Sequence, residues 1–268
     1  MPKRLPEALR AGTLALPASL LGVALATVAA TIYLMGGMIS GPGADLGGLG
    51  WFVGSWTLMM AAMMLPSVAP MALTFARVTS ERARKGQSDF VPTWVFILGY
   101  FAAWTAFGLV AYLVDHLIRM LDPAWLAWDR GGPVVAGIAV VAAGLYQLTP
   151  LKRVCLMHCR SPLDFFLSSW REGSRGALRM GIHHGCYCVA CCWGLMLVLF
   201  AVGVMSLFWM TVIAVLIFAE KVLQFGPRLA PVFGALLVAL GLWIAIAPAS
   251  IPGLHPPAAG SDMSGMKM

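Results

Sequence analysis

TWVFILGYFAAWTAFGLVAYLV, residues 93–114, is a run without a charged side chain. It matches in length the ~20 apolar residues that cross the hydrocarbon core of a bilayer as an α-helix. Only helices and closed barrels satisfy their backbone polar groups inside a bilayer, and this run does not alternate polar and apolar residues as barrel strands do. The run therefore predicts a transmembrane helix.

The composition of the whole chain has the same character. Hydrophobic residues make up 60% of the 268 residues and charged residues only 11%, whereas soluble domains carry roughly 25% charged residues. We therefore predict an all-α, polytopic transmembrane helical bundle surrounded by lipid. The net charge of +7 would suggest nucleic acid as a partner of a soluble protein. In a membrane protein the placement of charges matters more than their sum, so we expect no nucleic-acid partner.

Seven apolar blocks are candidates for membrane spans. They lie near residues 13–36, 51–75, 92–118, 132–150, 183–203, 206–224 and 229–248. We therefore predict a transmembrane helical domain over residues 1–250. Residues 251–268, rich in Pro, Gly, Ser and Met, are predicted to form a flexible outer tail.

Lys and Arg residues are distributed unevenly between these blocks. With seven spans, one side of the membrane receives all of the 18 Lys and Arg residues except Arg119, Arg130 and Lys267. Positively charged loops stay in the cytoplasm. We therefore predict a multi-pass protein of the bacterial inner membrane, with its N-terminus in the cytoplasm and its C-terminus outside.

Cysteine is concentrated in HHGCYCVACCW, residues 183–193. In a helix, Cys188, Cys192 and Met196 are spaced four apart and share one stripe, which Cys191 flanks. A free Cys is often a small buried hydrophobic residue. Four cysteines within seven residues, next to adjacent histidines, favour a functional role instead.

A second sulfur group follows the block at 132–150. If this segment is helical, Cys155 and Cys159 lie one turn apart with His158 beside them, on the same predicted side as His183 and His184. The reducing cytoplasm disfavours a structural disulfide there, which leaves metal binding or thiol chemistry. Cys-x3-Cys is not a standard zinc spacing.

Methionines gather in the block at 51–75, where Met59 and Met63, and Met60 and Met64, form two pairs four residues apart. Packing is one explanation, since Met fills irregular gaps. Thioether and thiol ligands select copper(I), whereas zinc accepts Cys and His but rarely thioether, so copper(I) is the favoured ion and zinc the less favoured one. The candidate metal ligands are Met60, Met63, Met64, Cys155, His158, Cys159, His183, His184, Cys188, Cys191, Cys192 and Met196.

The dipeptide Glu220-Lys221 ends the block at 206–224. Both side chains are expected near the cytoplasmic interface, where a snorkelling Lys and a neighbouring Glu cost little free energy. We therefore predict a structural ion pair between them.

Several segments resemble a family of predicted metal-binding bacterial integral membrane proteins that includes a tyrosinase-associated membrane copper chaperone. They are AGLYQLTPLKRVCLMHCRSP (Ala143–Pro162), GALRMGIHHGCYCVACCWGLMLVLFAVGVMSLFWM (Gly176–Met210), the EK pair at Glu220–Lys221, and WTLMMAAMMLPSVAP (Trp56–Pro70). The resemblance covers roughly residues 50–225 and implies copper delivery in the inner membrane, with a copper-dependent enzyme or copper carrier as partner. The positions that match the family are Met60, Met63, Met64, Cys188, Cys191 and Cys192.

Other functions fit part of this pattern. A membrane thiol–disulfide oxidoreductase would use paired cysteines, but all six are predicted on the cytoplasmic side, away from the oxidising compartment. A non-catalytic assembly subunit would use Met and Cys for packing alone. The sequence contains no phosphate loop, nucleophile–base arrangement or paired catalytic carboxylates, so we expect no enzyme. A copper chaperone and a copper transporter both fit, with movement in either direction.

Overall fold

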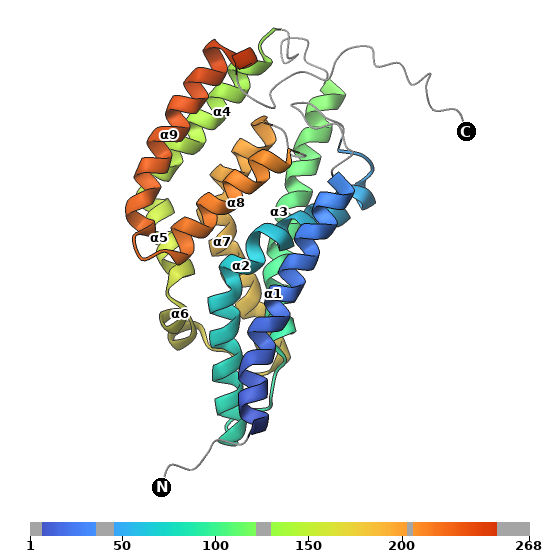
Figure 1. Cartoon of the computed structure of the whole chain (residues 1–268), viewed down its shortest axis with the longest axis vertical. Coiled ribbons are helices and arrows are strands. Elements are labelled where there is room, and N and C mark those ends of the chain that lie inside the picture. The colour runs from blue at the N-terminus through green and yellow to red at the C-terminus, as the bar shows by residue number, and fades with distance from the viewer. Residues whose placement is uncertain (1–6, 36–45, 122–129, 203–205, 251–268) are drawn as a thin grey trace, which may run out of the picture.

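The computed structural model describes residues 7–35, 46–121, 130–202 and 206–250, and every regular element within them is a helix (Figure 1). The all-α prediction is confirmed for these residues. In chain order the helices are α1 (Glu7–Met35), α2 (Leu49–Arg84), α3 (Thr93–Leu121), α4 (Gly132–Gln147), α5 (Pro150–Arg160), α6 (Pro162–Ser169), α7 (Gly173–Val202), α8 (Leu207–Val222) and α9 (Gly226–Ile246), followed by a 3-10 turn at Pro248–Ser250. The predicted outer tail, 251–268, lies outside the described residues.

Four helices of the described chain, α2, α3, α7 and α9, are long and apolar enough to cross a membrane. A fifth crossing results if α4 and α5, which meet at an angle of 66°, form one broken span. The predicted blocks at 13–36 and 206–224 coincide with α1 and α8, but the described apolar stretch of α1, Ala18–Leu34, and the whole of α8 are shorter than the other four. Seven spans and the orientation of the termini therefore remain predictions.

Helices α2 and α7 form the centre of the bundle. In each, 56% of the most apolar window is buried, against 22% in α3 and 28% in α9. The outer helices instead expose large apolar side chains, such as Leu113 and Leu117 of α3 and Leu236 and Trp243 of α9. Helices that are apolar on both their inner and outer faces are typical of proteins whose outer surface contacts lipid.

Glycine lets two helix pairs approach backbone to backbone. A Cβ atom on Gly181 of α7 would lie 2.1 Å from the carbonyl oxygen of Phe96 in α3, and one on Gly99 of α3 would lie 2.3 Å from that of Leu178. Helices α4 and α9, which lie side by side in Figure 1, meet in the same way at Gly144. Small residues at helix contacts allow the close packing on which membrane bundles depend.

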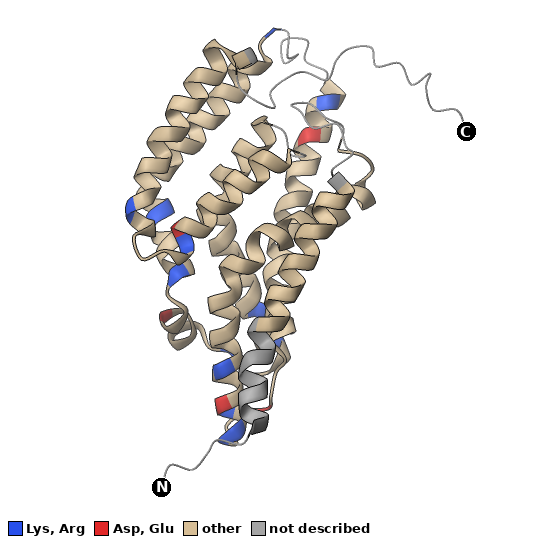
Figure 2. Cartoon of the chain, in the orientation of Figure 1, with Lys and Arg blue, Asp and Glu red and all other residues tan. Residues whose placement is uncertain are grey.

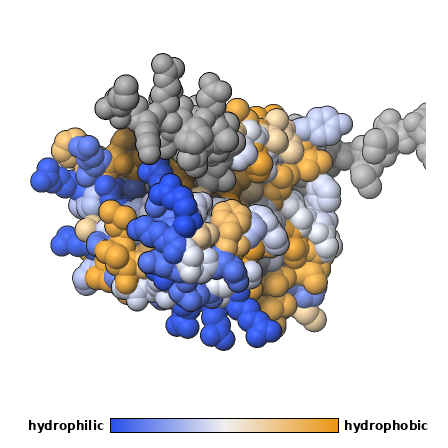
Figure 3. All heavy atoms as spheres, turned by 90° about the horizontal axis from the view of Figure 1, so that it is seen from below, coloured by the Kyte–Doolittle hydropathy of each residue, from blue (hydrophilic) through white to orange (hydrophobic). Residues whose placement is uncertain are grey.

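Positive charge gathers at one end of the molecule. Figure 2 shows Lys and Arg at the C-terminal end of α2, around α5 and at the start of α9, and Figure 3 views this end directly. At the opposite end, Arg119 in the last turn of α3 forms an ion pair with Asp115 at 2.7 Å. The folded chain thus has a basic end, as the positive-inside rule requires of a cytoplasmic face.

The segment 151–181, which lies between the predicted spans at 132–150 and 183–203, is mostly helical. It contains α5, the short helix α6, and the first turns of α7, which begins at Gly173. Helix α5 starts sharply because Pro150 occupies its first turn and the Thr149 hydroxyl accepts a hydrogen bond from the Lys152 amide at 3.3 Å. Near the other end of α5, Cys159 contacts Cys191 of α7.

We predict that Gly181→Ala lowers the melting temperature of the purified protein in detergent. The added methyl group would overlap the Phe96 carbonyl and cost about 1–3 kcal/mol in strain. Gly54→Ala is the matched control, because Gly54 lies in α2 with nothing near its Cβ position, and there the change should leave stability equal or higher. Equal melting temperatures for the two variants would contradict the close approach of α3 and α7.

Candidate metal centre

Three thiols of α7 converge inside the bundle. The sulfur atoms of Cys188, Cys191 and Cys192 all lie within 4.8 Å of one another, and all three residues are buried. The Cys191 and Cys192 sulfurs are 3.3 Å apart, and the Cys191 thiol donates to the Cys188 carbonyl at 3.2 Å. One helical turn separates Cys188 from the other two, so the periodicity of α7 itself brings the three soft donors together.

A fourth thiol reaches this group from α5. The Cys159 sulfur lies 3.7 Å from that of Cys191. Cys155, one turn earlier, is also buried in the core, but no sulfur–sulfur contact joins it to these thiols within the described part of the chain, and the exposed Cys186 lines a shallow pocket against α3. We call Cys159, Cys188, Cys191 and Cys192 the thiol cluster. The pair expected at Cys155 and Cys159 is thus divided, with Cys159 at the cluster.

Two polar side chains from other helices contact Cys188. The Tyr100 hydroxyl of α3 lies 2.9 Å from its sulfur, and the Lys221 ammonium of α8 donates to it at 2.8 Å. A monovalent cation held by two thiolates would give a complex of charge −1. The ammonium of Lys221 balances that charge where burial makes an unpaired charge costly.

The predicted ion pair between Glu220 and Lys221 is wrong. Glu220 pairs with Lys152 of α5 at 2.7 Å, and each of these two side chains is only 1% exposed. Gln147 donates to the other Glu220 oxygen at 2.8 Å, and the Lys152 ammonium also donates to the Cys191 carbonyl at 2.6 Å. Lys152, Glu220 and Gln147 therefore form a buried network that fixes the backbone of the thiol cluster.

The three predicted histidines occupy different environments. His184 is buried between the rings of Phe96 and Tyr100, and its Nδ1 atom has no hydrogen-bond partner among the described residues. His158 and His183 are exposed, and they contact the Tyr187 ring at centroid distances of 4.6 and 5.0 Å. His184 is therefore a buried donor one turn before Cys188, while His158 and His183 lie at the surface.

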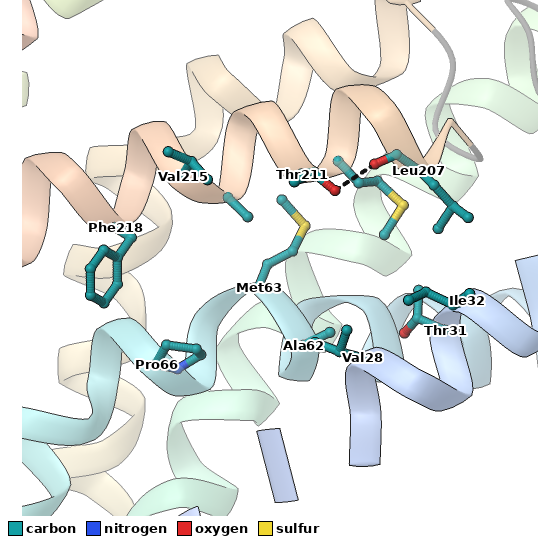
Figure 4. A pocket seen from close by; sticks show the side chains of 12 residues that line it. Val28, Thr31, Ile32, Ala62, Met63, Pro66, Leu207, Thr211, Val215 and Phe218 are labelled. Atoms are coloured by element: carbon teal, nitrogen blue, oxygen red, sulfur yellow. Dashed lines mark hydrogen bonds between the residues drawn. The ribbon is translucent and has the colours of Figure 1, made fainter. Parts of the chain in front are cut away.

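All four predicted methionine ligands are buried. Met60 and Met64 of α2 and Met196 of α7 are fully enclosed in the core. Met63 instead lines a cavity of about 450 Å³ between α1, α2 and α8 (Figure 4). The three predicted methionines of α2 therefore have different surroundings, because Met63 alone among them lines that cavity.

Tyr100 and Lys152 were not among the predicted site residues, and Lys221 was predicted to pair with Glu220 but contacts Cys188. The available signals were the phenol of Tyr100 within an apolar run and the charged groups of Lys152 and Lys221 beside apolar runs. Such groups need polar partners when they are buried. Their partners could not be read from the sequence, because Tyr100 and Cys188 are separated by 88 positions.

We predict that Lys152→Met lowers the melting temperature strongly, because removing one partner of a buried ion pair costs about 3–5 kcal/mol. Lys152→Met combined with Glu220→Leu should recover part of the loss, since no charge then remains unpaired. Glu81→Gln, which breaks the exposed pair with Arg84, is the control and should change stability by less than about 1 kcal/mol. A Lys152→Met variant as stable as the wild type would contradict the network.

The chain matches the model of a known family. The model of the family PpoB2, described as a copper chaperone, matches residues 53–244. That range includes the thiol cluster and each of its polar partners. No curated protein and no solved structure matches the chain.

Proposed function

This chain belongs to the PpoB2 family of copper chaperones, and we propose on that premise that it holds copper(I) within the bacterial inner membrane and delivers it to a copper-dependent enzyme. Tyrosinase represents the class of recipient that the family resemblance implies. The thiol cluster is the observation that carries the proposal, because three buried sulfur atoms within 4.8 Å of one another can ligate a soft ion.

The ligands assigned to copper(I) are Cys188, Cys191 and Cys192, with Cys159 completing the cluster from α5. Copper(I) suits this donor set because it is soft and monovalent. Lys221 supports the assignment, since its ammonium lies 2.8 Å from the Cys188 sulfur and balances a thiolate complex of negative charge. His184 stands next to the cluster as a further nitrogen donor.

The proposed location in a membrane rests on the surface of the bundle. Apolar faces of α3 and α9 point outward, and Lys and Arg gather at one end (Figure 2). We assign that basic end to the cytoplasm. His158 of α5 and His183 of α7 are exposed. We assign to them the exchange of copper between the thiol cluster and an incoming carrier.

We predict that the purified wild-type protein retains copper after anaerobic loading with copper(I), whereas Cys188→Ser/Cys191→Ser/Cys192→Ser loses it. Serine keeps the side-chain size but replaces a soft sulfur donor by a hard oxygen donor. Bound metal is measured by mass spectrometry after desalting. Cys186→Ser is the control, because Cys186 is exposed and outside the cluster, and it should load like the wild type.

Equal copper retention in the triple variant and the wild type would contradict the thiol site. A wild type without copper that carries a Cys159–Cys191 disulfide would favour the thiol–disulfide oxidoreductase, since those sulfurs are already 3.7 Å apart. A wild type with neither copper nor a disulfide would favour a non-catalytic assembly subunit.

The two cysteines of α5 give a separate prediction. Cys159→Ser should weaken copper(I) affinity by about 10- to 100-fold, the range seen when supporting groups around a metal are lost. Cys155→Ser on the same helix should leave the affinity unchanged, because Cys159, not Cys155, is the α5 cysteine whose sulfur contacts Cys191. Competition against a chromogenic copper(I) chelator measures both. Equal losses in the two variants would remove Cys159 from the cluster.

A further inference from the structure

We propose that Met63 of α2 and Met210 of α8 form a second soft-metal site, a thioether site for a monovalent cation, in the cavity between α1, α2 and α8. Both methionines line this cavity, and each is only 5% exposed. In Figure 4 the Met63 side chain extends from α2 toward α8. The proposal extends the proposed function, in which copper(I) is the cargo.

The cavity presents sulfur as its soft donor. None of the described residues that line it is ionisable. Its two hydroxyl groups already donate within their own helices, Thr31 to the Thr27 carbonyl at 2.7 Å and Thr211 to the Leu207 carbonyl at 2.8 Å. The two thioethers are therefore the lining groups suited to copper(I) or silver(I).

The charge of the site selects monovalent over divalent ions. Thioethers are neutral, so the complex keeps the full charge of the ion. The cost of burying an ion in an apolar environment grows with the square of its charge, so a divalent ion would be held much less well there. The cavity of about 450 Å³ also leaves room for the flexible Met side chains to adjust around an ion.

Helix α8 connects this cavity to the thiol cluster. Met210 lies near its start, and Lys221, which contacts Cys188, lies near its end. Eleven residues separate the two positions, which corresponds to about 16 Å along the helix axis. The cavity site is therefore distinct from the thiol cluster, and α8 carries both a lining residue of the cavity and the ammonium that contacts Cys188.

The test is the number of silver(I) ions bound per chain, measured by mass spectrometry on the full chain in lipid nanodiscs. Silver(I) serves as the probe because it resembles copper(I) and is not oxidised. Met63→Leu/Met210→Leu should bind one ion fewer than the wild type. Met71→Leu/Met180→Leu is the matched control, because these methionines are also buried but do not line the cavity, and it should bind as the wild type does.

Ala214→Leu offers an independent variant, since it fills the cavity without removing a sulfur atom and should also lower silver binding. An unchanged silver content in Met63→Leu/Met210→Leu would overturn the proposal. So would an equal loss of bound zinc in that variant, because the site would then accept divalent ions.

The silver-binding experiment can contradict either proposed site without contradicting the other. The triple serine variant of the thiol cluster should still bind the cavity ion, and combining it with Met63→Leu/Met210→Leu should abolish binding. If the triple serine variant binds as much silver as the wild type while the methionine variant loses an ion, the thiol site fails and the cavity site stands. If the triple serine variant loses all silver, the cavity proposal fails and the thiol site stands.

Discussion

A buried ion pair between Lys152 and Glu220 joins α5 to α8 in the middle of an apolar bundle. Neither charge can be left alone there, because an unpaired buried ion costs several kcal/mol, and the pair therefore restricts how α5 and α8 can slide. Lys152 also holds the Cys191 carbonyl, which fixes α7 relative to both. The residue after Glu220 is Lys221, so the same register brings its ammonium to Cys188. The geometry of the thiol cluster thus depends on a pair that contributes no ligand.

The opposite side of the cluster is set by backbone contact between α3 and α7. A Cβ atom on Gly185 would lie 2.8 Å from the Tyr100 carbonyl, so the close approach of α7 and α3 extends to this residue. That approach places the Tyr100 hydroxyl 2.9 Å from the Cys188 sulfur. The cluster is therefore held by charge on one side and by glycine-mediated packing on the other, and both constraints act on Cys188.

Local periodicity made the helices and the stripe of cysteines in α7 predictable, because apolar runs and four-residue spacing have direct helical consequences. The partners of Glu220 and Lys221 were not predicted, although helix geometry argues against the pair first expected, since adjacent residues do not face each other. The contacts between residues far apart in the sequence depend on how the helices pack and not on local periodicity. Which of Cys155 and Cys159 meets α7 depends on the 66° bend between α4 and α5, which no local pattern specifies.

The two proposed sites differ in net charge, and this difference makes a bound ion more stable at one site than at the other. An ion at neutral thioethers carries its full positive charge into an apolar cavity, whereas an ion at two thiolates beside Lys221 forms a group with no net charge. In a low-dielectric interior the second arrangement is the more stable one. Copper(I) would therefore collect in the thiol cluster, and its release requires a competing ligand that reaches the cluster. The exposed His158 and His183 lie beside Tyr187, one residue before Cys188, and mark the side from which such a ligand would approach.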